Sequence, residues 1–341
     1  MKVIVTGGTG YIGSHTIVDL LENDFEVVCI DNLARSTKYP IGAIEQITEK
    51  KFKFYQIDLC NKQETFDVLE QHKDAVGIIH FAAFKTVPES VANPILYYNN
   101  NLISLNNILE GIQKFGIPNF VFSSSCSVYG NAKALPVTEE TPFQEAESAY
   151  AHTKQIGEQI IQHYSKVNTT KSILLRYFNP VGAHPSGILG EMLLNRPDNL
   201  VPYITQTAIG KLEQLTVFGG DYDTPDGSCV RDYIHVCDIA HAHTLALKYL
   251  IENQNHSNCE IFNLGTGNGV SVLEAIHAFE KTTGQKLNYK VGARRAGDVE
   301  KIYANNEKAS KALKWHCQYN IEDAMLSAWK WENKMKELAL L

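Results

Sequence analysis

A glycine-rich segment near the N-terminus constrains the fold of this chain more than any other feature. A short segment at residues 2–5 with the pattern of a buried strand comes before Gly7, Gly10 and Gly13, and apolar positions at helical spacing follow as far as residue 23. Glycines so placed turn the chain sharply and let backbone amides at a helix N-terminus approach a pyrophosphate. The order of strand, loop and helix therefore predicts a dinucleotide-binding unit, whereas the glycines alone would also fit a plain turn.

An acidic residue follows the second apolar run. Residues 26–30 have the composition of a buried strand and end at Asp31, which lies 18 positions after Gly13. A carboxylate at this place hydrogen-bonds the adenosine ribose hydroxyls and repels the 2′-phosphate of NADP. The sequence therefore predicts NAD as the cofactor, although the neighbouring Arg35 leaves NADP open.

Tyr150 and Lys154 are the candidate base and its partner. They begin a segment whose apolar residues recur at helical spacing and which contains no proline through residue 166. Side chains four positions apart lie on one helical face, and an ammonium group near a phenol favours the phenolate, which can remove a hydroxyl proton. Tyr129 and Lys133 share the spacing, but the Gly-Asn dipeptide between them predicts a loop. Only the first pair is therefore expected to be reactive, and a solvated helical pair is its alternative.

Three consecutive hydroxyl side chains, Ser123, Ser124 and Ser125, follow an expected strand at residues 119–122. Open α/β sheets bind their ligands at the carboxyl ends of the strands. We therefore expect these serines beside the bound cofactor, although a serine run by itself would be an ordinary loop.

Four segments resemble the extended short-chain dehydrogenase/reductases and, within that family, the UDP-glucose 4-epimerases. They are residues 5–15 (VTGGTGYIGSH), 122–125 (FSSS), 175–187 (LRYFNPVGAHPSG) and 231–236 (RDYIHV), and the resemblance extends over essentially the whole chain. It implies an isomerase of galactose metabolism that interconverts UDP-glucose and UDP-galactose. In such an enzyme hydride passes from C4′ to tightly bound NAD, the 4-keto sugar rotates, and hydride returns to its other face.

The resemblance also implies a role for each residue of the site. Ser125, Tyr150 and Lys154 would be catalytic, and Lys154 would also hold the nicotinamide ribose. The NAD contacts would come from Gly7, Gly10, Tyr11, Ile12, Gly13, Asp31, Asn32, Ser36, Asp58, Leu59, Phe81, Ala82, Lys85, Asn100, Ser123, Tyr150, Lys154 and Tyr177. The UDP-sugar contacts would come from Lys85, Ser125, Tyr150, Asn179, Asn199, Leu200, Phe218, Arg231, Arg295, Asp298 and Ile302.

Ile302 bears on substrate breadth. By the resemblance it lines the sugar pocket, where a tyrosine restricts the substrate and a smaller residue admits a 2-acetamido group. A branched aliphatic side chain lacks the volume of a phenol, so we expect additional activity on UDP-N-acetylhexosamines. The alternative is that Ile302 packs in the core of the smaller domain.

Two other functions share parts of this site. A nucleotide-sugar 4,6-dehydratase would use the same NAD and tyrosine base, but such enzymes usually carry an Asp-Glu pair after the serine or threonine at the sheet edge, and here Ser125 is followed by Cys126 and Ser127. An NAD-responsive binding protein would not need a reactive tyrosine. Incubation with UDP-galactose separates the three, because the products are an epimer, a dehydrated keto sugar or unchanged material.

The alternation of strand-like and helix-like segments predicts the fold class. It runs from residue 1 to about residue 178, with expected strands at 52–57, 77–82, 119–124 and 172–177, and this predicts an α/β fold with a Rossmann-type doubly wound parallel sheet. We expect an NAD-binding domain at 1–180, to which a helix and strand at 236–264 return by the resemblance. A smaller α/β UDP-sugar-binding domain would comprise 181–235 and 265–341.

Composition excludes several partner classes. The net charge of −7 and pI of about 6.0 provide no general attraction for nucleic acid, and no apolar run reaches the ~20 residues of a membrane span. The first strand begins at residue 2, so we expect no signal peptide and a cytoplasmic enzyme. Seven cysteines without a Cys-x-x-Cys pair fit reduced thiols, and the resemblance implies a homodimer.

One cluster of metal-ligand residue types is expected to be structural. His235, Cys237, Asp238, His241 and His243 lie within nine positions, but His241 and His243 diverge around a helix because they are two residues apart. No separate Cys-His pair completes a tetrahedral set, so we expect no metal site.

Overall fold

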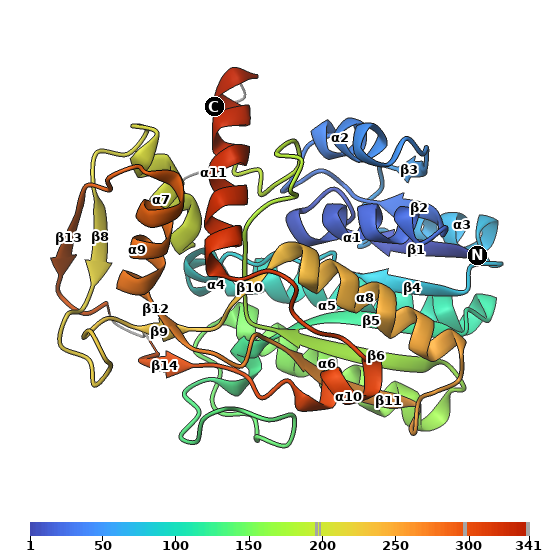
Figure 1. Cartoon of the computed structure of the whole chain (residues 1–341). Coiled ribbons are helices and arrows are strands. Elements are labelled where there is room, and N and C mark those ends of the chain that lie inside the picture. The colour runs from blue at the N-terminus through green and yellow to red at the C-terminus, as the bar shows by residue number, and fades with distance from the viewer. Residues whose placement is uncertain (195–196, 198, 296–298, 339–341) are drawn as a thin grey trace.

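The computed structural model describes residues 1–194, 197, 199–295 and 299–338. Its largest sheet has seven strands in the order β11-β6-β5-β4-β1-β2-β3, and each neighbouring pair is parallel (Figure 1). The strands are β1 (Lys2–Thr6), β2 (Glu26–Ile30), β3 (Lys53–Tyr55), β4 (Gly77–His80), β5 (Asn119–Ser125), β6 (Lys171–Tyr177) and β11 (Cys259–Leu264). Chain order reverses between β1 and β4, which is the topological switch point where such sheets bind dinucleotides. The predicted fold class is confirmed.

Helices cover both faces of this sheet. Successive side chains of each strand point to opposite faces, and both faces carry apolar side chains that the helices bury. Val3 and Val5 belong to the core beneath one set of helices, and Ile4 belongs to the core beneath the other. The first set contains α1 (Tyr11–Glu22), α2 (Tyr39–Thr48), α8 (Val236–Ile251) and α10 (Glu307–Leu313). The second contains α3 (Lys62–Gln71), α5 (Pro94–Phe115) and α6 (Ala149–Val167).

Most of the remaining elements form a smaller group with its own apolar core. Three small sheets pair β7 (Asn179–Val181) with β10 (Tyr233–His235), β8 (Leu215–Phe218) with β13 (Tyr289–Gly292), and β9 (Val230–Arg231) with both β12 (Val270–Ser271) and β14 (Lys301–Ile302). Helices α7 (Leu200–Ala208), α9 (Val272–Thr283) and α11 (Ile321–Glu337) lie with them in this group (Figure 1). Its core includes Ile276, Phe279 and Met325.

The expected elements agree with the observed ones to within a few residues. The strand expected at 52–57 is limited to Lys53–Tyr55, and the strand expected after residue 259 is β11, which pairs with β6 in the large sheet. The boundaries given above for the two domains remain a prediction. No described helix is both long enough and apolar enough to span a bilayer.

Candidate active site

The predicted cofactor residues lie at one edge of the large sheet. Parallel strands end at the same edge, so the residues that follow them gather there. These residues are Gly7 after β1, Asp31 after β2, Phe81 and Ala82 after β4, Ser123 to Ser125 at the end of β5, and Tyr177 at the end of β6.

The glycine loop forms a cradle that larger residues would fill. A Cβ atom on Gly13 would lie 2.3 Å from the carbonyl oxygen of Gly7, and a Cβ atom on Gly7 would lie 2.7 Å from the amide nitrogen of Ala82. Gly7 also has a φ of +68°, which side chains rarely adopt. Gly10 precedes the first turn of α1, so free amides of this helix point toward the cradle. The cradle therefore fits the pyrophosphate of a dinucleotide.

Asp31 organises the loop next to this cradle. Its carboxylate accepts hydrogen bonds from the amides of Thr9 (3.2 Å) and Leu33 (2.9 Å) and from the Ser36 hydroxyl (3.2 Å). Arg35 is engaged elsewhere, because its guanidinium pairs with Glu89 at 2.7 Å. The acid that repels a 2′-phosphate is thus in place, and the arginine that left NADP open is paired with a carboxylate.

The other predicted residues of the adenosine end adopt turn geometries. The Asn32 side chain accepts a hydrogen bond from the backbone amide of Ala34, and the Asp58 carboxylate accepts one from the amide of Cys60, each at 2.9 Å. Asp58 is exposed, so its contact with adenine stays a prediction beside its observed role in the turn. Leu59 is buried, and the Asn100 side chain donates to Asn101 at 2.9 Å.

The three predicted catalytic residues meet at the start of α6. Ser148 caps this helix by accepting the amide of Ala151 at 3.1 Å, which places Tyr150 in the first turn. One turn later, the Lys154 ammonium lies 5.9 Å from the centre of the Tyr150 ring and donates to the Ser123 carbonyl at 2.6 Å. The Tyr150 phenol is hydrogen-bonded with Ser125. A base, a hydroxyl and a buried ammonium are therefore within one small region.

The predicted effect of Lys154 on the Tyr150 phenol is not found in the protein alone. Burial raises the pKa of Tyr150 to about 12, and the hydrogen bond with Ser125 only partly opposes this. Burial also lowers the pKa of Lys154 to about 8, against the opposing charge of Glu158. The expectation from spacing was wrong because it counted the charge of the ammonium and left out the desolvation of both groups.

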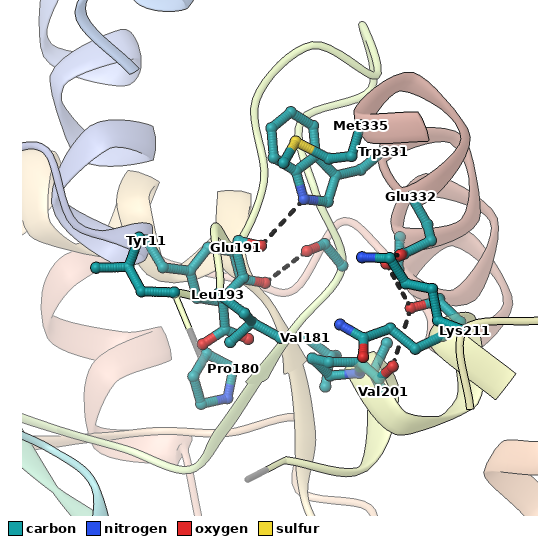
Figure 2. A pocket seen from close by; sticks show the side chains of 16 residues that line it. Tyr11, Pro180, Val181, Glu191, Leu193, Val201, Lys211, Trp331, Glu332 and Met335 are labelled. Carbon is teal, nitrogen blue, oxygen red and sulfur yellow. Dashed lines mark hydrogen bonds and ion pairs between the residues drawn. The ribbon is translucent and has the colours of Figure 1, made fainter. Parts of the chain in front are cut away.

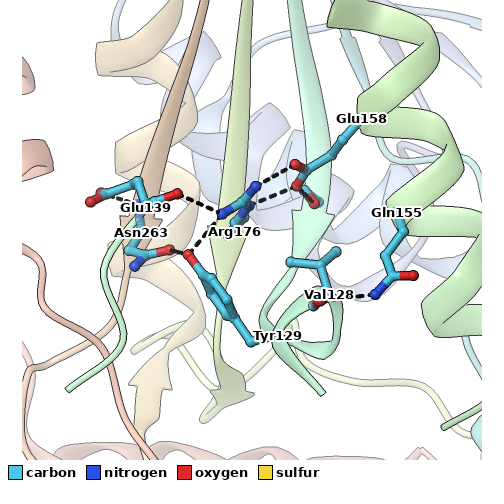
Figure 3. A network of polar contacts seen from close by, with 8 residues as sticks. Val128, Tyr129, Glu139, Gln155, Glu158, Arg176 and Asn263 are labelled. Atoms are coloured by element: carbon cyan, nitrogen blue, oxygen red, sulfur yellow. Dashed lines mark hydrogen bonds and ion pairs between the residues drawn. The ribbon is translucent and has the colours of Figure 1, made fainter. Parts of the chain in front are cut away.

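Tyr129 has a structural place that the sequence did not predict. The loop predicted after it is present, but Tyr129 itself is fully buried at the end of a 3-10 helix, η1 (Cys126–Tyr129). Its hydroxyl donates to the Asn263 side chain at 2.6 Å and accepts from Arg176 at 2.9 Å (Figure 3). Tyr129 is therefore part of a buried polar network and is not an inert counterpart of Tyr150.

Some residues predicted for UDP are brought together. The Arg295 guanidinium lies over the Phe218 ring, 5.4 Å from its centre, and Phe218 is exposed. Arg231 donates to the Val230 carbonyl at 2.9 Å and stands opposite Ile302 in the pairing of β9 with β14. Asp298 lies outside the described residues.

The remaining sugar-side residues lie at the starts of elements. Asn179 begins β7, and Asn199 immediately precedes α7, which starts at Leu200. Ile302 is 5% exposed and packs in a cluster that includes Tyr129 and Phe178. This burial agrees with the alternative that Ile302 is a core residue. Phe178 of the same cluster directly precedes Asn179, however, so the predicted role of Ile302 in the sugar pocket stays a prediction.

Two acidic residues that the sequence did not point to join distant segments of the chain, and one of them binds a predicted site residue. Glu191 forms an ion pair with Lys85, with 2.6 Å between the Lys85 Nζ and Glu191 Oε1 atoms. Asp232 is fully buried, and its carboxylate accepts the amides of Thr266 (2.8 Å) and Ala304 (3.1 Å). Both contacts join segments that are far apart in the sequence, so no local pattern could reveal them.

A cavity of about 370 Å³ lies between α7, α11 and the segment that follows β7 (Figure 2). Its lining includes Tyr11, Glu191, Lys211, Trp331 and Glu332. None of the three predicted catalytic residues lines this cavity. Of the predicted NAD contacts, Tyr11 alone is among its lining residues. We therefore place the chemistry at the start of α6 and treat this cavity as a neighbouring space.

The residues of the suspected metal cluster have separate partners. His235 contacts Ser327, His241 pairs with Asp19, and the Asp238 carboxylate accepts two backbone amides. Within residues 1–194, 197, 199–295 and 299–338, no group of three or more His, Cys, Asp or Glu side chains is arranged to hold a metal ion.

Comparisons with known proteins agree with this geometry. The chain matches the GDP-mannose 4,6 dehydratase family model over residues 4–327. It is 46% identical to a UDP-glucose 4-epimerase from Schizosaccharomyces pombe over 337 residues, covering 97% of this chain and 94% of that one. A solved UDP-glucose-4-epimerase from Stenotrophomonas maltophila, with bound NAD and formylated UDP-arabinopyranose, superposes with a TM-score of 0.96 at 40% identity over 99% of both chains. A UDP-Glc/GlcNAc 4-epimerase from Campylobacter jejuni has a TM-score of 0.85 at 36% identity, over 98% of this chain and 99% of that one.

Proposed function

This chain belongs to the UDP-glucose 4-epimerases, and on that premise we propose how its residues carry out the reaction. The enzyme is an NAD-dependent isomerase that interconverts UDP-glucose and UDP-galactose. The observation that supports the roles below is the meeting of Ser125, Tyr150 and Lys154 at the same edge of the large sheet as the glycine cradle.

Tyr150 is the base in this proposal. It takes the proton of the 4′-hydroxyl, and Ser125 hydrogen-bonds in the same network and orients that hydroxyl. When bound, NAD supplies reversible hydride acceptance at C4′ and, in its oxidised form, the positive charge that lowers the pKa of a nearby phenol. Lys154 holds the nicotinamide ribose, and the 4-keto sugar turns its other face before Tyr150 returns the proton.

The UDP moiety is assigned to the smaller group of elements. Arg231 and Arg295 suit a diphosphate because guanidinium groups form charge-assisted hydrogen bonds with it. Phe218 is 43% exposed and offers its ring to uracil. Asn179, Asn199 and Leu200 complete this proposed set.

The dehydratase alternative is set aside. The relatives described above are named 4-epimerases, and Cys126 and Ser127 occupy the positions where a dehydratase carries its acid pair. The binding-protein alternative gives no reason for a buried ammonium beside a partly buried phenol.

We expect the purified protein to retain NAD through dialysis and to convert UDP-galactose to UDP-glucose without added cofactor. The reason is that each cycle regenerates the cofactor, so its release has no role in turnover. Denaturation followed by nucleotide chromatography measures the NAD, and product chromatography measures the epimer. Activity that consumes stoichiometric external NAD would indicate an ordinary dehydrogenase, and a dehydrated product would restore the alternative set aside above.

We further propose that UDP-N-acetylhexosamines are also substrates and that Ile302 admits them. Replacing Ile302 with Tyr should lower turnover of the N-acetylated sugars far more than that of UDP-glucose, because the added volume excludes the larger group selectively. Steady-state kinetics on both sugars measures the difference. Since Ile302 is buried, thermal unfolding of the variant must accompany the kinetics. Equal losses on both substrates would place Ile302 in the core alone.

Two further proposals concern assembly and location. A homodimer is supported by exposed apolar side chains along α4 (Val87–Ala92) and α5, namely Val87, Val91, Ile95, Leu96 and Ile103. Sedimentation velocity tests it, and a monomer at working concentrations would refute it. A cytoplasmic location is supported by the enzyme family, and cell fractionation tests it.

A further inference from the structure

Two loops flank the glycine cradle, and an ion pair joins them. In the large sheet β1 lies between β2 and β4, so the loops that follow β2 and β4 lie on either side of the glycine loop that follows β1. Arg35 belongs to the loop after β2, and Glu89 stands in the first turn of α4, which follows β4. The Arg35 Nη2 atom lies 2.7 Å from Glu89 Oε1. The pair therefore connects the two sides of the cradle across 54 positions of sequence.

Arg35 makes a second contact on the far side of the cradle. Its guanidinium lies 4.7 Å from the centre of the Phe84 ring, in the loop between β4 and α4. The next residue after each of them, Ser36 and Lys85 respectively, is a predicted NAD contact. A dinucleotide in this fold lies in the crevice at the end of β1, with its adenosine ribose beside the acid after β2. The bridge made by Arg35 therefore crosses the crevice that the cofactor occupies.

The far end of the bridge is held by buried side chains. The second carboxylate oxygen of Glu89, Oε2, accepts a hydrogen bond from the Tyr97 hydroxyl at 2.7 Å, and Tyr97 is fully buried on α5. The Tyr97 ring also packs edge-on against Phe84, with 5.9 Å between ring centres. The backbone of Phe84 shares two hydrogen bonds with the Asn101 side chain, at 2.8 Å and 3.1 Å. The surface that receives Arg35 is thus fixed by residues of α5.

The bridge lies nearer to solvent than the cradle. The Arg35 and Glu89 side chains are 43% and 27% exposed, whereas Gly8 and Gly13 of the glycine loop are buried. An ion pair with this exposure contributes little to folding stability, because water competes for both charges. Its two side chains can therefore separate without the unfolding of any helix or strand.

We propose that Arg35 and Glu89 form a clasp over the NAD site, so that the cofactor enters and leaves when the pair separates. The inference rests on the proposed function, in which NAD stays bound from one cycle to the next. Phe84 positions the guanidinium, and Tyr97 positions the carboxylate. The clasp sets the rates of NAD uptake and release and takes no part in hydride transfer.

The test measures the exchange of bound NAD for radiolabelled NAD in Arg35→Gln, Glu89→Gln and the double variant. NAD-loaded protein is mixed with excess labelled NAD, and the label that stays with the protein through gel filtration is followed with time. Each single variant should exchange about two- to tenfold faster than the parent, because it loses an exposed ion pair and, in Arg35→Gln, a cation–π contact as well. The double variant should exchange no faster than Arg35→Gln, since both changes open the same clasp.

The rate of NAD uptake separates a clasp from a direct contact with the cofactor. In protein stripped of nucleotide a clasp slows entry as well as exit, so the variants should take up NAD faster, and the dissociation constant should change less than the release rate. A side chain that only binds NAD would change both quantities by the same factor. Equal changes in the two quantities, parental exchange in Glu89→Gln, or effects that multiply in the double variant would each overturn the inference.

Lys281→Gln is the matched control. It breaks an exposed ion pair with Glu322, at 2.6 Å, that joins α9 to α11 in the smaller group of elements. Its NAD exchange should keep the parental rate, and denaturant midpoints of all the variants should stay close to that of the parent. Faster exchange in Lys281→Gln, or exchange that follows the loss of stability, would refute the clasp.

The parent protein separates failure of the clasp from failure of the proposed function. A parent that neither retains NAD nor converts UDP-galactose would refute the proposed function and the clasp with it. A parent that does both, with variants that exchange NAD at its rate, would refute the clasp alone.

Discussion

Replacing Tyr150 with Phe should lower turnover by about 10²-fold or more while NAD content and UDP-sugar binding stay close to those of the parent. The substitution removes the phenolic oxygen and keeps the ring, and general-base catalysis typically contributes that order of rate. The structure sharpens the expectation, because the oxygen that is lost is the one hydrogen-bonded with Ser125. Steady-state kinetics with UDP-galactose measures the loss, and nucleotide chromatography measures the bound NAD.

Tyr164 provides the matched control on the same helix. It is half-buried on α6, and its hydroxyl makes one long contact of 3.3 Å with Thr170. Tyr164→Phe should therefore keep parental turnover. Tyr129 is unsuitable, since its hydroxyl belongs to the buried network with Arg176. Near-normal turnover in Tyr150→Phe would remove Tyr150 from the mechanism, and an equal loss in both variants would point to a general effect on α6.

Replacing Gly13 with Ala should weaken NAD binding. The new methyl carbon would lie 2.3 Å from the Gly7 oxygen and 2.9 Å from the Gly8 Cα, and both are backbone atoms that cannot move independently. Overpacking of this kind typically costs about 1–3 kcal/mol, and the start of α1 would have to move away from the cradle. We expect NAD affinity to fall by about tenfold or more, since 1.4 kcal/mol corresponds to that factor.

Gly42 in α2 is the control for this change. A Cβ atom there meets nothing within 4 Å, so Gly42→Ala should leave NAD binding intact and stabilise the helix by roughly 0.5–1 kcal/mol. Both glycines are helical, so a difference between the variants cannot come from helix propensity. Isothermal titration of protein stripped of nucleotide measures the affinity. Full NAD affinity in Gly13→Ala would show that the cradle does not depend on this close approach.

Several features could be predicted because their signals are local. The glycine spacing, Asp31 after the second strand, and the helix that carries Tyr150 and Lys154 each occupy a short stretch of sequence. Their geometry follows from the fixed periods of strands and helices and from the steric freedom of glycine. The fold class followed in the same way, from the alternation of strand and helix patterns, and the family resemblance supplied the activity.

Contacts between distant segments could not be predicted. Lys85 meets Glu191, which is 106 positions away, and Asp232 binds backbone amides of two later segments. Tyr129 looked like a loop residue because Gly130 follows it, yet packing against Asn263 and Arg176 buries it completely. No local pattern carries this information, because it depends on which side chains the fold brings together.

The sequence by itself determined which groups this protein uses: the glycine cradle, Asp31, and the serine, tyrosine and lysine of the candidate site. The tertiary structure decided their charge states and supports. Burial raises the pKa of Tyr150 to about 12 and lowers that of Lys154 to about 8, and Glu158 opposes the second shift. The physical reason is that spacing along a helix fixes which groups are neighbours, whereas desolvation and long-range pairing depend on everything that packs around them.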